Sequence, residues 1–168
     1  DQGRLWYIPH HGVYHPNKPG KIRVVFDCSS NFKGTSLNEN LISGPDLSNQ
    51  IIGVLIRFRE QPVAVMGDIE AMFHQVKIPE KDRSLLRFLW WEDHDIRKPI
   101  TDLEMNVHVF GSTSSPSCFN YALKRTALDN ISNYQPEVIN TVLKNFYIDD
   151  LLKSVKDASI GKTLIQDV

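Results

Sequence analysis

The sequence has little cysteine. It contains two, Cys28 and Cys118, in 168 residues. That number is too small for the disulfide framework that holds many small secreted domains together. The favoured interpretation is two reduced thiols in a cytosolic chain.

Long apolar runs are missing as well. No stretch approaches the roughly 20 apolar residues of a membrane-spanning helix, so no membrane is expected among the partners. The polar start Asp1-Gln2-Gly3-Arg4 shows no signal peptide. Because the first residue is not Met, we expect a piece of a longer polypeptide. Hydrophobic residues make up 41% and charged residues 23%, which is ordinary usage for a folded globular domain.

The sequence also lacks net charge of either sign. Its formal charge of -1 argues weakly against nucleic-acid binding. Four cations nevertheless lie close together with Asp27 as the one anion among them, namely Lys18, Lys21, Arg23 and Lys33. A channel can be basic while its domain is neutral. On charge alone, a solvated basic loop is the favoured interpretation.

Apolar runs and turn signals predict strands interrupted by helices. Strands are expected near 12–15, 22–27, 63–67, 75–78, 85–91, 103–110, 146–148 and 151–155. Helices are expected from an Asp46 cap to about 59, as one turn at 80–84, from Pro116 with Ser115 as its cap, from 136 to about 145, and at 159–168. The run 63–67 is apolar throughout and predicts a buried strand. This order of elements indicates an α+β fold with a largely antiparallel sheet.

Three aspartates stand beside apolar segments. Asp68 follows the run 63–67, and Asp149 and Asp150 lie at an expected hairpin turn with apolar residues on both sides. Adjacent like charges near a core are costly unless cations compensate. Magnesium favours carboxylate oxygens, and two ions about 4 Å apart can promote phosphoryl transfer. The carboxylates converge if the two strands pair, but the Asp-Asp pair alone favours a solvated turn.

Four motifs resemble those of reverse transcriptases. Tyr147-Ile148-Asp149-Asp150 is similar to the Tyr-x-Asp-Asp signature, and Asp68-Ile69-Glu70-Ala71-Met72-Phe73 resembles the first catalytic motif. The segment 111–119 is similar to the Gly-x-x-x-Ser-Pro-x-x-Phe that opens the palm helix. Arg23-Val24-Val25-Phe26-Asp27 resembles the fingers strand. Their order and spacing agree across nearly the whole chain, which makes the resemblance specific.

Further segments are similar to the BEL/Pao group of long-terminal-repeat retrotransposons. They are Pro9-His10-His11-Gly12-Val13, Cys28-Ser29 after the fingers strand, Ser36-Leu37-Asn38-Glu39, Gly44-Pro45 and Phe88-Leu89-Trp90. In that group the reverse transcriptase belongs to a polyprotein with protease, ribonuclease H and integrase. The resemblance implies partners in the thumb, ribonuclease H and integrase regions of that polyprotein. It also implies a cytoplasmic retrotransposon particle, with the nucleus as a further location at integration.

The resemblance implies a right-hand polymerase fold without its thumb, with a mainly antiparallel palm sheet backed by helices. Residues 1–62 and 79–106 would form the fingers, and 63–78 and 107–168 the palm of one C-terminally truncated domain. The implied activity is RNA-directed and DNA-directed DNA synthesis. A primer 3′-hydroxyl attacks a deoxynucleoside triphosphate on an RNA or DNA template. The fragment alone is expected to be weakly active or inactive.

Metal ligands follow from the same resemblance. Asp68 and Asp149 would be the main ligands of two Mg²⁺ ions, which Mn²⁺ can replace. Asp150 would complete the site with a lesser role, and the Ile69 carbonyl would add a backbone ligand.

The resemblance also implies contacts to the triphosphate. Arg23 and a lysine would hold it. Lys18 aligns best with the family's lysine, and Lys21 is a close rival. The backbone amides of Ala71 and Met72 would bind phosphate oxygens.

Two aromatic residues complete the implied nucleotide pocket. Phe73 stands where the family has a ring beneath the incoming sugar, which would collide with a ribose 2′-hydroxyl. Core packing is the alternative role for Phe73. Phe110, before Gly111, replaces a glutamine of retroviral relatives and offers only apolar or stacking contact.

Two other functions remain open. A catalytically inactive or domesticated fragment could bind nucleic acid or a protein partner, although the presence of all three aspartates and Arg23 argues against decay. Another magnesium-dependent phosphotransferase would need the Asp pair, but it would explain neither Phe73 nor the segment 111–119.

Overall fold

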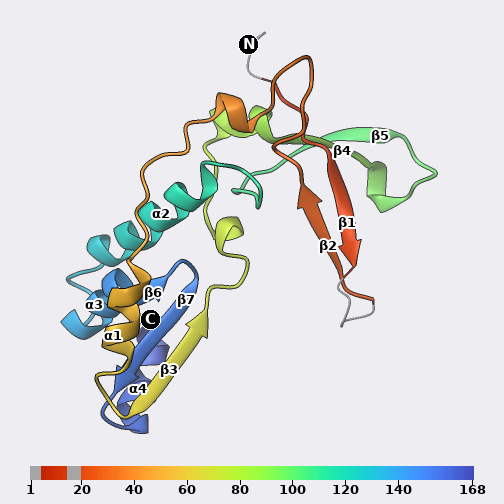
Figure 1. Cartoon of the computed structure of the whole chain (residues 1–168). Coiled ribbons are helices and arrows are strands. Elements are labelled where there is room, and N and C mark those ends of the chain that lie inside the picture. The colour runs from red at the N-terminus through yellow and green to blue at the C-terminus, as the bar shows by residue number, and fades with distance from the viewer. Residues whose placement is uncertain (1–4, 15–19) are drawn as a thin grey trace. The chain divides into compact units, whose positions relative to one another are not determined.

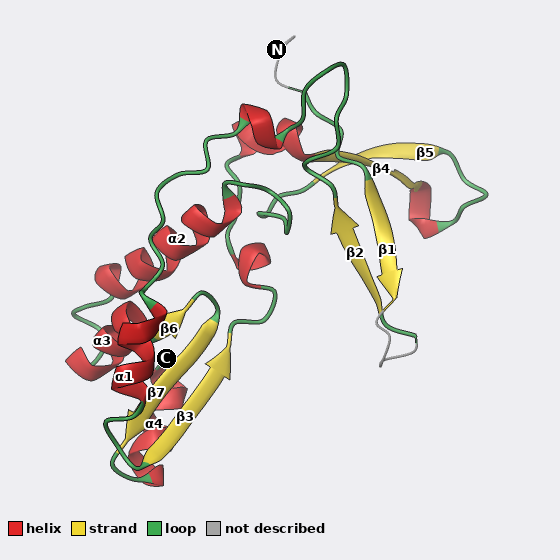
Figure 2. Ribbon diagram, viewed as in Figure 1, coloured by secondary structure: helices red, strands yellow, loops and turns green. Residues whose placement is uncertain are grey.

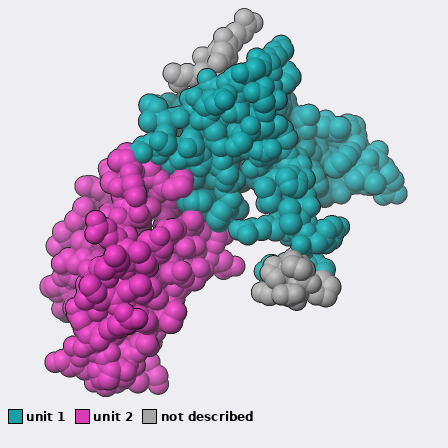
Figure 3. Space-filling model, in the orientation of Figure 1, with its two compact units in different colours: residues 1–44, 73–115 teal, residues 45–72, 116–168 magenta. Residues whose placement is uncertain are grey.

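The computed structural model describes residues 5–14 and 20–168, and the chain forms two compact units. Unit 1 comprises Asp1–Gly44 and Phe73–Ser115, and unit 2 comprises Pro45–Met72 and Pro116–Val168 (Figure 3). Each unit is therefore built from two separate stretches of sequence. The division into fingers and palm at residues 62, 78 and 106 stays a prediction.

Unit 1 contains two antiparallel hairpins (Figure 1). Strands β1 (His10–Tyr14) and β2 (Ile22–Phe26) form one, and β4 (Arg87–Trp91) and β5 (Ile100–Glu104) form the other. Four rings connect the hairpins with centroids 5.3 to 5.6 Å apart; they belong to His10, Phe26, Phe88 and Trp90. Phe26 also packs against the buried core of the unit, which contains Ile8, Cys28, Leu37, Ile78, Leu86 and Val109.

The predicted hairpin near 12–15 and 22–27 is confirmed, apart from His15, which lies outside the described residues. The strand predicted at 103–110 is wrong beyond Glu104. Beyond Met105 the chain bonds to another segment, because Ile78 N donates to Asn106 O and His108 N donates to Val76 O. Of the strand predicted at 75–78, only a bridge between Lys77 and Val107 forms.

A short 3₁₀ helix replaces the first part of another predicted strand. The turn expected at 80–84 extends over Glu80–Leu86. Strand β4 therefore starts at Arg87 rather than at residue 85.

Unit 2 is a three-stranded antiparallel sheet with helices packed on it (Figure 2). The strand order is β3 (Val63–Asp68), β7 (Asp150–Val155), β6 (Phe146–Tyr147). The helices are α1 (Ile51–Phe58), α2 (Ser115–Asp129), α3 (Pro136–Lys144) and α4 (Ala158–Asp167). One face of the sheet forms the core with α3 and α4; its buried residues are Val65, Val138, Phe146, Leu151, Val155 and Leu164.

Local sequence explains where the last two helices begin. Pro136 opens α3 at the first helical position, where its missing N–H has no intrahelical partner to lose. Asp157 caps α4 by accepting hydrogen bonds from the backbone N–H groups of Ser159 and Ile160. The Ser159 hydroxyl also donates to the Asp157 carboxylate. This bond, followed by the two backbone bonds, lowers the pKa of Asp157. No helix in the described ranges combines the length and apolar character that crossing a bilayer requires.

Three predictions for the helices and strands around unit 2 are wrong in detail. Ser115 is the first residue of α2 and not its cap, and its Oγ donates to Val109 O. Asp46 does not cap α1; its carboxylate accepts from Ser48 N at 2.9 Å, and this local turn delays the helix to Ile51. The strand 63–67 is not buried on both faces, because Val65 points into the core whereas Met66 is 69% exposed. Successive side chains of a strand face opposite sides.

Candidate active site

The strand pairing in unit 2 brings the three aspartates to one end of the sheet. Asp68 and Asp150 are direct partners on β3 and β7. Such side chains share a face and have Cβ atoms about 4.5–5.5 Å apart. The backbone N–H of Ile69 donates to the carbonyl oxygen of Asp149 at 3.1 Å, which holds the turn against the end of β3. The strand pairing that the convergence of the three carboxylates requires, between β3 and β7, is therefore present.

The turn between β6 and β7 is a two-residue loop. Because Tyr147 pairs with Asp150, the loop consists of Ile148 and Asp149, and Asp150 opens β7 rather than lying in the turn. Ile148 has a φ of 57°, a left-handed conformation that is rare for a β-branched residue. Such conformations cost about 1–3 kcal/mol and persist where the surroundings impose them.

Asn49 contributes one such constraint, and sequence reasoning missed it. Its side-chain amide donates to Leu143 O at 3.1 Å and to Phe146 O at 2.8 Å. One amide thereby connects the end of α3 to the start of β6. Its position before a helix carries no sequence signal for this role, since its partners lie more than 90 residues away in the chain.

The donor chemistry of this sheet end fits a hard cation. Asp68 and Asp150 are exposed and Asp149 is half-buried. Like charges directly opposite on paired strands are destabilising, and carboxylate oxygens are the donors that Mg²⁺ prefers. Within the described ranges, however, no three His, Cys, Asp or Glu side chains are gathered closely enough to hold a metal. The backbone thus brings the three aspartates to one end of the sheet, but their carboxylates are not close enough together to share a metal ion.

Three predicted nucleotide contacts meet in unit 1. The rings of Phe73 and Phe110 have centroids 4.7 Å apart at 55°, and the guanidinium carbon of Arg23 lies 5.4 Å from the Phe110 centroid. The ring of His74 meets Phe110 edge-on at 5.5 Å. Arg23 is exposed, Phe110 is half-buried, and Phe73 is 7% exposed. Phe110 therefore contacts both of the other predicted residues.

Asn38 holds the loop after Phe110 in place. Its side-chain amide donates to Gly111 O at 2.9 Å, and its side-chain oxygen accepts from Thr113 N at 2.9 Å. Its amide also lies 3.0 Å from Ser29 Oγ. Sequence reasoning used Asn38 only as part of a family resemblance and missed this role.

The other predicted phosphate contacts are placed as follows. Lys18 lies outside the described residues, and Lys21 is exposed just before β2. Ala71 has a left-handed φ of 50°, and the side chain of Met72 is buried. A left-handed residue beside a right-handed one turns successive amides to the same side, the geometry of an anion-binding nest.

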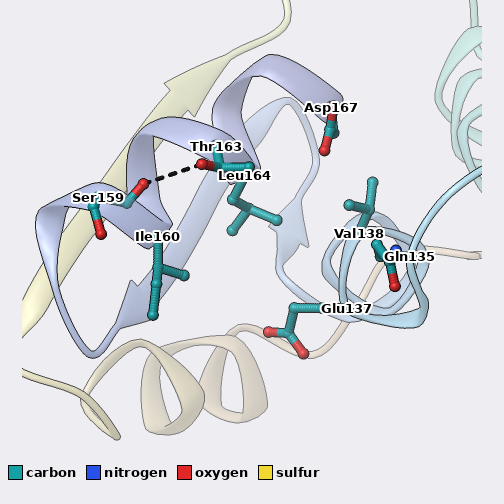
Figure 4. Close-up of a pocket in the computed structure, with 8 residues that line it drawn as sticks. All are labelled: Gln135, Glu137, Val138, Ser159, Ile160, Thr163, Leu164 and Asp167. Carbon is teal, nitrogen blue, oxygen red and sulfur yellow. Dashed lines mark hydrogen bonds between the residues drawn. The ribbon is translucent and has the colours of Figure 1, made fainter.

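Cavities lie between the helices and at the end of the sheet in unit 2. A cavity of about 310 Å³ separates the start of α3 from α4, where Glu137 and Val138 face Ile160 and Leu164 (Figure 4). Thr163 Oγ1 donates to Ser159 O at 3.3 Å inside α4. A smaller cavity, of about 210 Å³, has Asp68 in its wall.

Comparison with solved structures finds a similar fold elsewhere. A foamy viral protease-reverse transcriptase in complex with double-stranded DNA is 19% identical, has a TM-score of 0.64, and is matched over 96% of this chain. The foamy viral enzyme in complex with an RNA/DNA hybrid is 17% identical over 95% of this chain, with a TM-score of 0.61. The chain has a reverse transcriptase-like fold. It spans 24% and 18% of the length of those two chains.

The native prototype foamy virus protease-reverse transcriptase gives a similar result, with 19% identity over 96% of this chain and a TM-score of 0.62. No protein-family model and no curated protein matches the sequence. The predicted α+β class with antiparallel sheets is confirmed, and so is the reverse transcriptase-like fold. Membership of the BEL/Pao group and the roles of individual site residues stay predictions.

Proposed function

We propose that the chain is the fingers and palm of an RNA-directed and DNA-directed DNA polymerase from a BEL/Pao-type retrotransposon polyprotein. One observation carries the proposal: Asp68 and Asp150 are direct partners at the end of a sheet, with Asp149 beside them, in a reverse transcriptase-like fold. A solvated turn explains an Asp-Asp pair. It does not explain a third aspartate brought opposite from a distant strand.

In this proposal Asp68, Asp149, Asp150 and the Ile69 carbonyl would hold two Mg²⁺ or Mn²⁺ ions. When bound, these ions supply the positive charge that favours attack by the primer oxygen and departure of pyrophosphate. The protein itself contributes by holding the aspartates in position. The bond from Ile69 N to Asp149 O fixes the turn, and the pairing of Tyr147 with Asp150 fixes the start of β7.

The proposed substrates are deoxynucleoside triphosphates and a template-primer duplex. Arg23 and Lys18 or Lys21 would bind the triphosphate, together with the amides of Ala71 and Met72. Two of the foamy viral structures are complexes, one with double-stranded DNA and one with an RNA/DNA hybrid, which supports nucleic acid of the same class here. Phe73 would act as the gate that excludes a ribose 2′-hydroxyl.

Primer extension on a homopolymer RNA template tests the proposal. The full polypeptide that carries this chain should extend the primer, and Asp149→Asn should reduce extension to background. Asp129→Asn is the matched control, since this surface aspartate pairs with Arg125 within α2 and should leave extension unchanged. Equal extension by Asp149→Asn and the unaltered protein would contradict the assignment. Binding of template-primer without any extension would favour the inactive nucleic-acid-binding fragment.

A further inference from the structure

We infer that Phe110 is a positioning residue that sets both the ring of Phe73 and the guanidinium of Arg23, so that one side chain couples sugar selection to triphosphate binding. The inference rests on the proposed function and extends it. Phe110 replaces the glutamine of retroviral relatives, so a polar contact to the nucleotide is absent at this position. The contacts that the Phe110 ring makes instead carry the inference.

The first observation is the contact between two rings. Phe110 and Phe73 have centroids 4.7 Å apart, within the range of about 4.5–7 Å over which aromatic pairs attract. Phe73 is 7% exposed and Phe110 is half-buried. Because Phe73 has so little exposed surface, the ring of Phe110 beside it helps to set which edge of Phe73 faces a sugar. His74 in turn packs edge-on against Phe110.

The second observation is the cation over the same ring. The Arg23 guanidinium carbon lies 5.4 Å from the Phe110 centroid, inside the roughly 6 Å reach of a cation–π contact. A stacked guanidinium uses its face and keeps its N–H edge for planar acceptors such as phosphate. Arg23 is exposed on β2, where an unsupported side chain samples many rotamers. The ring of Phe110 restricts it to an orientation that can meet a triphosphate.

The third observation is the fixed backbone around Phe110. Its neighbour Val109 is fully buried, and Ser115 Oγ donates to Val109 O at 2.9 Å. On the other side, Asn38 binds Gly111 O. Phe110 is held between two anchored residues, so its ring is a rigid surface for both Phe73 and Arg23. A glutamine there would offer amide hydrogen bonds but no ring to Phe73.

The test is steady-state primer extension with deoxynucleotides and ribonucleotides measured separately. Phe110→Leu removes the ring and keeps an apolar side chain. It should raise the ribo/deoxy ratio of kcat/KM in the same direction as Phe73→Val, and it should raise KM for the deoxynucleotide. Each change should be roughly two- to tenfold, the range that one aromatic contact supports. Phe110→Tyr keeps the ring and should restore both values.

Phe32→Leu is the matched control. Phe32 carries the Lys33 ammonium 5.3 Å from its ring centroid but is 64% exposed, so its loss should change neither the ratio nor KM. If Phe110→Leu does not fold, as judged by circular dichroism, Phe110→Met is the second ringless variant. Unchanged ratio and KM in a folded ringless variant, while Phe73→Val raises the ratio, would overturn the inference and leave the proposed function standing.

A double-mutant cycle tests the coupling to Arg23. Arg23→Lys keeps the charge and removes the planar group. The effect of Arg23→Lys with Phe110→Leu on KM should be smaller than the product of the two single effects, because each removes the same contact. Independent, multiplying effects would contradict the coupling. If the unaltered protein extends no primer at all, the proposed function fails, and the inference falls with it.

Discussion

Gly111 occupies a position that no other residue can take without strain. Its φ is 99°, and a Cβ added there would lie 2.7 Å from the carbonyl oxygen of Phe26. That carbonyl belongs to β2, where strand pairing limits its movement. Gly111 follows Phe110, and its own carbonyl accepts the Asn38 amide. A side chain at this position would therefore disturb the Asn38 contact and the Phe110 surface together.

Gly111→Ala should lower the free energy of unfolding by about 1–3 kcal/mol or more, because strain in φ and a steric clash add. Gly34→Ala is the control, since Gly34 also has a positive φ, 86°, but nothing lies within 4 Å of its added Cβ. Gly34→Ala should cost about 1–2 kcal/mol. Urea unfolding of the purified variants measures both losses. Equal losses would show that the approach of Phe26 O has no effect.

Single residues divide into those that local sequence predicts and those it cannot. Pro136 at the start of a helix follows from its own chemistry, and the structure confirms it. Asn38 and Asn49 act through partners far away in the chain, and no local pattern reports such contacts. Asp46 has a side chain that can cap a helix, but its carboxylate accepts a hydrogen bond from the Ser48 hydroxyl instead.

Strands β3 and β7 hold a carboxylate pair whose cost can be measured without any catalytic assay. Opposed like charges on paired strands are destabilising by about 0.2–1 kcal/mol. Both Asp68 and Asp150 are exposed, so salt should screen their repulsion. A cation bound by both would reverse the sign of the effect, because it binds only the folded arrangement.

Asp150→Asn should raise the melting temperature slightly in EDTA at low salt, since it removes one of the opposed charges. In millimolar Mg²⁺ the same variant should lose that advantage, because the unaltered protein gains stability from the bound ion. Thermal unfolding followed by circular dichroism measures the difference. Asp129→Asn should shift the melting temperature equally in both buffers. The same shift for Asp150→Asn in EDTA and in Mg²⁺ would argue against a cation at this sheet end.

Elements were predicted better by type than by extent. Apolar runs predicted β3, β6 and β7 to within one residue at their ends, although Asp150 opens β7 instead of lying in the turn. The strand predicted at 103–110 was too long, because its own residues do not show where its partner strand stops. The pairing of β3 with β7 joins residues far apart in sequence. The sequence could not predict this pairing, so the site hypothesis had to assume it.

The two units have separate buried cores. Leu86 belongs to the core of unit 1 and Leu151 to that of unit 2, and both are almost fully buried. No apolar pattern in the sequence marks this division, because each unit combines two stretches of chain. The α+β class, by contrast, follows from the order of elements and is confirmed.

Leu86→Ala and Leu151→Ala should each cost about 2–5 kcal/mol, but in different places. Hydrogen exchange read by mass spectrometry should show faster exchange mainly in unit 1 for Leu86→Ala and mainly in unit 2 for Leu151→Ala. Ile52→Ala, on an exposed position of α1, is the control and should leave exchange in both cores unchanged. Faster exchange throughout the chain in both core variants would mean that the two units unfold together.

The interleaving of the units also sets an order of events during synthesis. A growing chain that ends at Met72 has made β1, β2 and β3, yet neither unit is complete. Unit 1 can close once Ser115 has left the ribosome, whereas β3 must wait for β7 to pair. Until then β3 exposes an unpaired edge, the kind of surface that invites aggregation. Asp68 and Asp150 therefore cannot meet before β7 has been made, and a chain whose synthesis stops before β7 lacks the pair.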